Sequence, residues 1–218
     1  MRTPLLRLLC LIVTFTSCGI AAPERWADEI IKLTANDSTQ PPPQNAVLFV
    51  GSSSIRMWDS LARDFPGIAV INRGFGGSEI PDSIFYADQI ILPYRPRSIV
   101  LYAGENDINS GKSPENVAAD FKTFREKIHA ARPETHIYYL SMKYSPSRSK
   151  HKAAMQRGNE LIAADCEQAK NCTFVDVNTP MLDAAGQPQA KLFLKDQLHM
   201  RPEGYAIWTK VLKPLLQP

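Results

Sequence analysis

Four short polar segments of this 218-residue chain could together carry out acyl transfer. The first, Gly51 to Ser54, holds three serines and interrupts an apolar run before residues with helical spacing, so we expect a strand, a tight turn and a helix start. A serine hydroxyl at such a start lies beside unpaired backbone N–H groups and the positive end of the helix dipole, which stabilise an anion. The same residues also fit a plain turn with an N-capping serine.

Two further loops could hold the anion that such a serine generates. The segment Asn72 to Ser78 has three glycines within four residues, so its backbone can approach a ligand closely and point N–H groups at it. The segment Gly104 to Asp107 follows an uncharged run, and the amide of Asn106 could donate a hydrogen bond to an oxyanion. Both segments also fit ordinary turns, and the glycines lack the spacing of a nucleotide-binding loop.

A candidate base lies near the C-terminus, where Asp196 and His199 are three residues apart. A carboxylate at this spacing can hold the imidazole in one tautomer while the other ring nitrogen takes the serine proton. A surface pair beside the last helix is the alternative interpretation. The other histidines fit structural or solvated positions better, because His129 lies in an amphipathic helix pattern, His136 opens a strand and His151 is among basic residues.

The elements that must position these segments follow from an alternation of apolar runs and longer amphipathic stretches. This alternation is typical of βαβ units and of a parallel sheet covered on both faces. Ligands of such sheets bind beyond the carboxyl ends of the strands, so the first three loops should converge on one crevice. The predicted strands are 47–50, 68–71, 98–102, 136–140 and 173–177.

The spacing of apolar residues also predicts several helices. A short one contains Trp26 and Leu33 and precedes a proline-rich surface connector at 38–45. The clearest helix begins at Ser113, with proline in its first turn, and ends before Pro133. Two more are predicted over about 150–169 and 202–214.

The N-terminal 22 residues resemble a secretory signal peptide, with Arg2 and Arg7 before an uncharged run and small residues up to Ala22. The run is too short to span a bilayer. Cleavage near 19–22 competes with lipid attachment at Cys18, and either route predicts a secreted or periplasmic protein or a lipoprotein. Removing two arginines lowers the formal net charge from +3 to +1, which argues against nucleic-acid binding.

Two cysteines, Cys166 and Cys172, remain after the leader is removed. In an oxidising compartment they could form a local disulfide, and two reduced buried thiols are an equally good interpretation of the spacing. No zinc-binding pattern is present, because the Cys-x5-Cys spacing lacks a second pair of ligands and the histidines are scattered.

Taken together, the motifs resemble those of the SGNH, or GDSL-type, hydrolase family over about residues 46–216. The matching segments are Phe49 to Ile55, Asn72 to Gly77, Gly104 to Asp107 and Asp196 to His199. We therefore divide the chain into a signal peptide (1–22), an N-terminal helix with its connector (23–45) and a hydrolase domain (46–218). One departure is Ser52, which stands where the family has aspartate before the nucleophile.

The resemblance implies a flavodoxin-like α/β/α sandwich and a serine esterase or lipase that needs neither a metal nor an organic cofactor. It makes Ser53 the nucleophile, Asp196 and His199 the rest of a triad, and Gly77 and Asn106 the partners of the Ser53 N–H in an oxyanion hole. A small-molecule ester would be the substrate. An esterase that removes O-acetyl groups from carbohydrates would use the same residues, and a catalytically silent binding module is the rival from another class.

Overall fold

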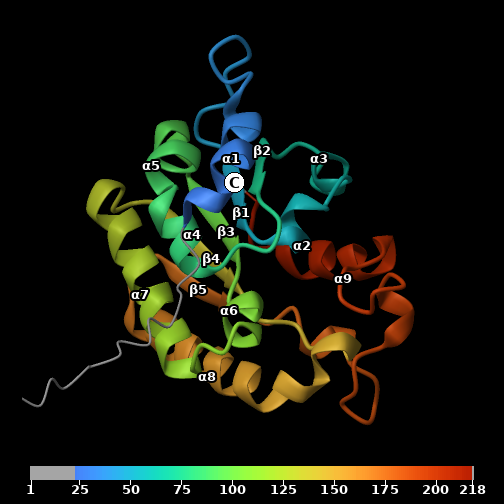
Figure 1. Cartoon of the computed structure of the whole chain (residues 1–218). Helices are drawn as coiled ribbons and strands as arrows, with labels where there is room; N and C mark the ends of the chain where they lie inside the picture. The colour runs from blue at the N-terminus through green and yellow to red at the C-terminus, as the bar shows by residue number, and fades with distance from the viewer. Residues whose placement is uncertain (1–22, 218) are drawn as a thin grey trace, which may run out of the picture.

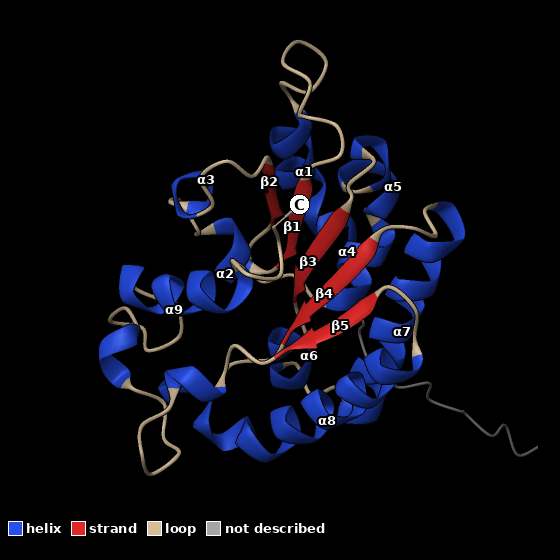
Figure 2. Cartoon of the chain, turned by 180° about the vertical axis from the view of Figure 1, so that it is seen from behind, coloured by secondary structure: helices blue, strands red, loops and turns tan. Residues whose placement is uncertain are grey.

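A five-stranded parallel sheet forms the centre of the computed structural model, which describes residues 23–217. The predicted signal peptide, with Cys18, lies outside the described residues. The strand order is β2-β1-β3-β4-β5, and helices cover both faces (Figure 2), which confirms the predicted fold class. The strands are β1 (Val47–Gly51), β2 (Val70–Gly74), β3 (Ser98–Tyr102), β4 (His136–Leu140) and β5 (Cys172–Val175).

The register of the central strands brings three loops to one edge of the sheet. Gly51, the last residue of β1, lies opposite Gly74 of β2 and Tyr102 of β3. All three strands therefore end at the same level. The loops that leave them begin side by side, as expected at the carboxyl edge of a parallel sheet.

Alternate side chains of the strands enter two separate apolar cores. Leu48 and Val50 of β1 pack towards one layer of helices, and Val47 and Phe49 pack towards the other. Figure 1 shows α1, α4, α5, α7 and α8 on one side of the sheet and α2, α3 and α9 on the other. The α-helices are α1 (Ala27–Thr34), α2 (Ser53–Arg56), α3 (Leu61–Asp64), α4 (Ile80–Phe85), α5 (Ala87–Ile90), α6 (Glu105–Asn109), α7 (Pro114–Ala131), α8 (Lys152–Gln168) and α9 (Pro202–Leu212). The 3-10 helices are η1 (Pro23–Trp26), η2 (Leu92–Tyr94), η3 (Pro146–His151), η4 (Thr179–Met181) and η5 (Ala190–Leu192).

The ends of α7 follow from its sequence. The Ser113 side chain accepts a hydrogen bond from the Asn116 N–H at 3.2 Å, and Pro114 fills the first helical position, where no N–H partner is needed. The helix stops at Ala131, two residues before Pro133. These bounds agree closely with the predicted ones.

Strand β2 differs from the prediction, because it begins at Val70 and continues through Gly74 instead of covering 68–71. Gly67 has a φ of +81°, and the Ile68 N–H donates to the Phe65 carbonyl, so a turn occupies the predicted start. At the other end, Arg73 is held in the strand by an ion pair with Asp37 at 2.7 Å. The strand therefore carries polar residues that the sequence alone places in a loop.

The N-terminal elements η1 and α1 pack on the layer that contains α4 and α5. Ile30 is buried in this contact. Among residues 23–217, no helix is both long and apolar enough to cross a membrane. The sulfur atoms of Cys166 and Cys172 lie 2.8 Å apart without a bond between them, at the end of α8 and the start of β5.

Candidate active site

The turn between β1 and α2 exposes one of the three consecutive serines. Gly51 has a φ of +125°, and a Cβ atom there would lie 2.0 Å from the Tyr102 carbonyl oxygen, so only glycine fits between β1 and β3. Ser52 and Ser54 are buried, with 4% and 2% of their surface exposed, whereas Ser53 at the start of α2 is partly exposed. The fold thus presents the Ser53 hydroxyl to a substrate and withdraws its two neighbours.

Ser53, His199 and Asp196 form a continuous chain of hydrogen bonds. The Ser53 Oγ lies 2.9 Å from Nε2 of His199, and Nδ1 of the same ring lies 2.6 Å from Oδ2 of Asp196. An ionised carboxylate can only accept, so Nδ1 carries the proton and Nε2 is free to accept from the serine hydroxyl. This is the arrangement that a serine nucleophile and its base require.

The Asp196 carboxylate also builds the turn that carries His199. Its Oδ1 accepts the backbone N–H groups of Leu198 at 2.9 Å and His199 at 3.0 Å. Burial alone would raise the pKa of Asp196, but the hydrogen bonds from the His199 ring and from these two N–H groups outweigh it and lower the pKa to about 2. The carboxylate is therefore ionised throughout the neutral range and keeps the imidazole oriented.

The glycine-rich loop after β2 offers an unpaired N–H group at Gly77. The Gly76 N–H donates to Glu29 Oε1 of α1 at 3.0 Å. Within residues 23–217, by contrast, neither the Gly77 nor the Ser53 N–H donates a hydrogen bond. Gly77 is exposed and has a φ of +72°, a left-handed conformation that favours glycine. These two free donors are the ones that an oxyanion could use.

Asn106 supplies a third donor next to this loop. Its Nδ2 donates to the Ser78 carbonyl at 3.1 Å, and because an amide nitrogen carries two protons, one N–H remains for a ligand. The following residue, Asp107, is fully buried and accepts the Ile80 N–H at 3.2 Å and the Lys112 ammonium at 3.0 Å. Burial raises the pKa of Asp107 to about 6, although the Lys112 charge acts in the opposite direction.

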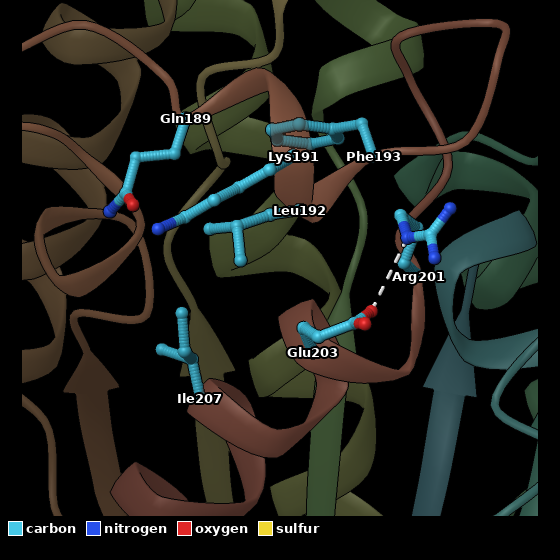
Figure 3. Close-up of a pocket in the computed structure, with 7 residues that line it drawn as sticks. All are labelled: Gln189, Lys191, Leu192, Phe193, Arg201, Glu203 and Ile207. Atoms are coloured by element: carbon cyan, nitrogen blue, oxygen red, sulfur yellow. Dashed lines mark hydrogen bonds and ion pairs between the residues drawn. The ribbon is translucent and has the colours of Figure 1, made fainter.

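Two hollows lie near these loops, and neither is lined by Ser53 or His199. The larger, of about 660 Å³, lies between η5 and the start of α9 (Figure 3). Arg201 and Glu203, which follow His199, form part of its wall and are joined by an ion pair at 3.4 Å. The smaller, of about 380 Å³, lies beside α2 and β2.

Not every residue close in sequence to the site loops lies at the site. Trp58 is 1% exposed and packs against Trp208 and Phe65, so it belongs to the core. Glu105 and Lys143 are also buried, as an ion pair. Ser147 does lie at the site, because its N–H donates to the carbonyl of Gln197 in the Asp196–His199 turn at 3.1 Å.

Two of the remaining histidines, His129 and His136, occupy structural positions. Nε2 of His129 lies 3.1 Å from the Thr135 carbonyl oxygen, and Nε2 of His136 lies 2.8 Å from the Thr173 hydroxyl. In the part of the chain that the structure describes, no group of three or more His, Cys, Asp or Glu side chains could hold a metal ion.

Sequence reasoning missed the contribution of the N-terminal segment. Glu29 holds Gly76, and the Trp26 ring lies 3.4 Å from where a Cβ of Gly77 would be. The helical spacing of Trp26 and Leu33 indicates a helix, but nothing in it indicates which loop the helix contacts.

Comparison with known proteins gives one match by sequence. The model of the GDSL-like Lipase/Acylhydrolase family matches residues 33–207, which includes all four polar segments. No curated protein is significantly similar to the sequence.

Solved structures share the fold at low sequence identity. A protein from Streptococcus pneumonia, provisionally named a platelet activating factor, is 22% identical with a TM-score of 0.77, covering 88% of this chain and 94% of that one. A GDSL-like lipase from Bacteroides thetaiotaomicron is 20% identical with a TM-score of 0.68, covering 89% and 96%. A variant of an acetyl xylan esterase from Geobacillus stearothermophilus is 14% identical with a TM-score of 0.66, covering 80% and 95%.

Proposed function

Because the chain belongs to the GDSL-like lipase/acylhydrolase family and is a carboxylic ester hydrolase, we propose that it acts through a Ser53-His199-Asp196 triad. The observation that supports this proposal most directly is the unbroken hydrogen-bonded chain from the Ser53 hydroxyl through the imidazole to the Asp196 carboxylate. With Asp196 ionised, Nδ1 of His199 donates to the carboxylate and Nε2 can accept the serine proton, as nucleophilic attack requires.

In the first half of the reaction, the Ser53 Oγ attacks the ester carbonyl carbon while Nε2 of His199 takes the hydroxyl proton. The carbonyl oxygen becomes an oxyanion, which accepts hydrogen bonds from the Ser53 N–H, the Gly77 N–H and the free N–H of Asn106. The intermediate then collapses, the bond to the alcohol oxygen breaks, and the imidazolium gives its proton to the departing alcohol. An acyl group remains on Ser53.

In the second half, a water molecule takes the place of the alcohol. His199 removes a proton from the water as its oxygen attacks the acyl carbon, and the same donors hold the second oxyanion. Collapse breaks the bond to Ser53 Oγ, which regains the proton from the imidazolium, and the carboxylic acid leaves. Asp196 stabilises the imidazolium in both halves without taking a proton itself.

A fluorophosphonate probe tests the assignment of the nucleophile. We expect the wild-type protein to be labelled on the peptide that contains Ser53, and Ser53→Ala to lose both the labelling and the hydrolysis of p-nitrophenyl acetate. Ser54→Ala is the matched control, because this neighbouring hydroxyl is buried, and it should retain both. The opposite result, with Ser54→Ala inactive and Ser53→Ala active, would show that the wrong serine is assigned.

Small, water-soluble esters are the substrate class that we propose. Gly77 is exposed and 22% of the His199 side chain is accessible, so solvent reaches the site, and neither of the two hollows is lined by Ser53. O-acetylated carbohydrates are a second candidate within this class, favoured by the structural similarity to an acetyl xylan esterase. A panel of p-nitrophenyl esters from acetate to octanoate, run beside acetylated xylooligosaccharides, tests both. Activity that rises with acyl-chain length would refute the small-ester proposal.

A further inference from the structure

A buried ion pair lies beneath the candidate oxyanion hole. The Lys143 ammonium is 2.7 Å from Glu105 Oε2, and the two residues are 1% and 5% exposed. The Tyr102 hydroxyl donates to the same carboxylate oxygen and lies 3.2 Å from the ammonium. Both charges are therefore paired inside the protein.

The pair joins two loops at the carboxyl edge of the sheet. Glu105 begins the loop helix α6 after β3, and Lys143 follows β4. The loop that contains Lys143 continues to Ser147. The Ser147 N–H donates a hydrogen bond to the Gln197 carbonyl, in the turn that carries the catalytic histidine. The ion pair thus connects the loop of the oxyanion donor with a loop that contacts the base.

Asn106 lies between two acidic anchors. On one side Glu105 binds Lys143, and on the other the buried Asp107 carboxylate accepts the Ile80 N–H from the glycine-rich side of the crevice. The Asn106 amide itself is bonded to the Ser78 carbonyl. A residue fixed on both sides has few conformations left, which is what a preorganised donor requires.

Stability alone does not explain such a pair. Removing two charges from water is costly, and apolar residues of similar volume often stabilise a core as well as or better than a buried ion pair. A buried polar contact does, however, fix one geometry, because an ammonium and a carboxylate satisfy each other in few arrangements. The pair is therefore better suited to setting a position than to holding the fold together.

We propose that Glu105 and Lys143 are positioning residues that hold the Asn106 amide at the oxyanion. This inference rests on the proposed function, in which Asn106 is an oxyanion donor. The ion pair fixes the start of α6, and α6 fixes the direction of the amide. Neither charged side chain contacts the substrate.

The test replaces both charges by apolar residues of similar size, in Glu105→Leu/Lys143→Met. We expect this variant to fold, because no charge is left unpaired. Its free energy of unfolding should fall by about 1–3 kcal/mol, because the buried Tyr102 hydroxyl loses its acceptor. Its kcat on p-nitrophenyl acetate should fall roughly 10- to 100-fold, part of the roughly 10²–10³-fold loss that removal of a whole donor causes. KM should change less than about threefold, because the lost interaction is made only in the transition state.

A double-mutant cycle with Asn106→Ala separates positioning from a general structural effect. If the pair acts through the amide, the same double replacement should cost less than about threefold in a protein that already lacks the amide. The matched control is the ion pair between Arg125 of α7 and Asp165 of α8, whose Nε and Oδ2 atoms are 2.9 Å apart. This pair lies away from the crevice. Arg125→Met/Asp165→Leu should retain the wild-type kcat.

Two results would overturn the proposal. One is that Glu105→Leu/Lys143→Met keeps the wild-type kcat. The other is that this double replacement lowers kcat by the same factor in the Asn106→Ala protein as in the wild type. If that variant does not fold, Glu105→Gln/Lys143→Met replaces it with the same expectations, because glutamine keeps an acceptor for the Tyr102 hydroxyl. Labelling of Ser53 by the fluorophosphonate probe tests the proposed function separately, so the two failures are distinguishable.

Discussion

Replacing Asp107 with asparagine is expected to remove part of the pH dependence of folding stability. The Asp107 carboxyl is 0% exposed, and burial raises its pKa to about 6 from the ordinary value of 3.8. The folded chain therefore keeps this proton at pH values where the unfolded chain has released it. The stability that the proton provides is fully present below pH 3.8 and is lost as the pH rises through 6.

The magnitude follows from the two pKa values, which differ by 6 − 3.8 = 2.2. At about 1.36 kcal/mol for each unit, the whole effect is about 3 kcal/mol, of which about 2 kcal/mol falls between pH 4.5 and 7.0. Asparagine has no charge to lose, and its oxygen can still accept the Ile80 N–H. Lys112 keeps Asp120 at 2.8 Å and Glu79 at 3.3 Å, so the substitution leaves no unpaired cation.

Urea denaturation at the two pH values measures the effect. Relative to the wild type, the free energy of unfolding of Asp107→Asn should rise by about 2 kcal/mol from pH 4.5 to 7.0. Asp88→Asn is the control, since the Asp88 side chain is 67% exposed and should give no change of this kind. If the free energy of unfolding of Asp107→Asn, relative to the wild type, rises by less than about 0.5 kcal/mol between these pH values, the reasoning from burial is refuted.

Four further outcomes are expected. Asn106→Ala should lower kcat by roughly 10²–10³-fold with little change in KM, as steady-state kinetics would show. Asp196→Asn should lower kcat by about 10⁴-fold. A mild oxidant should join Cys166 and Cys172, detected by mass as the loss of two hydrogens, and the closed loop should stabilise the fold by about 2 kcal/mol, an effect absent in Cys172→Ser. Expressed in a bacterium, the full chain should be exported and cut near residue 22, and Cys18→Ser should leave its export unchanged, whereas lipid labelling of Cys18 would contradict simple cleavage.

Local patterns predicted the parallel sheet because each strand is an apolar run bounded by turn residues. Strands β3 and β4 agree with the prediction at both ends. Strand β2 does not, since its last residues are polar and are held by a contact with Asp37, 36 positions away. A pattern that extends over a few residues contains no information about such a partner.

The same limit applies at the site. The sequence identified the residue types and the four segments, because each chemical role needs a particular side chain or a glycine. It could not identify what fixes them: Glu29 on the glycine-rich loop and Lys143 on Glu105 are contacts between distant elements. Glutamate is seldom buried, and only the structure shows that Glu105 lies inside the protein, paired with Lys143.

The bond between Ser53 and His199 joins residues 146 positions apart. During synthesis, the proposed nucleophile leaves the ribosome long before the proposed base, so we expect the serine of a nascent or C-terminally truncated chain to be unactivated. Contacts between such distant residues also cost the most loop-closure entropy and form late. In the proposed mechanism, hydrolytic competence therefore arises only when the last segment docks on the sheet.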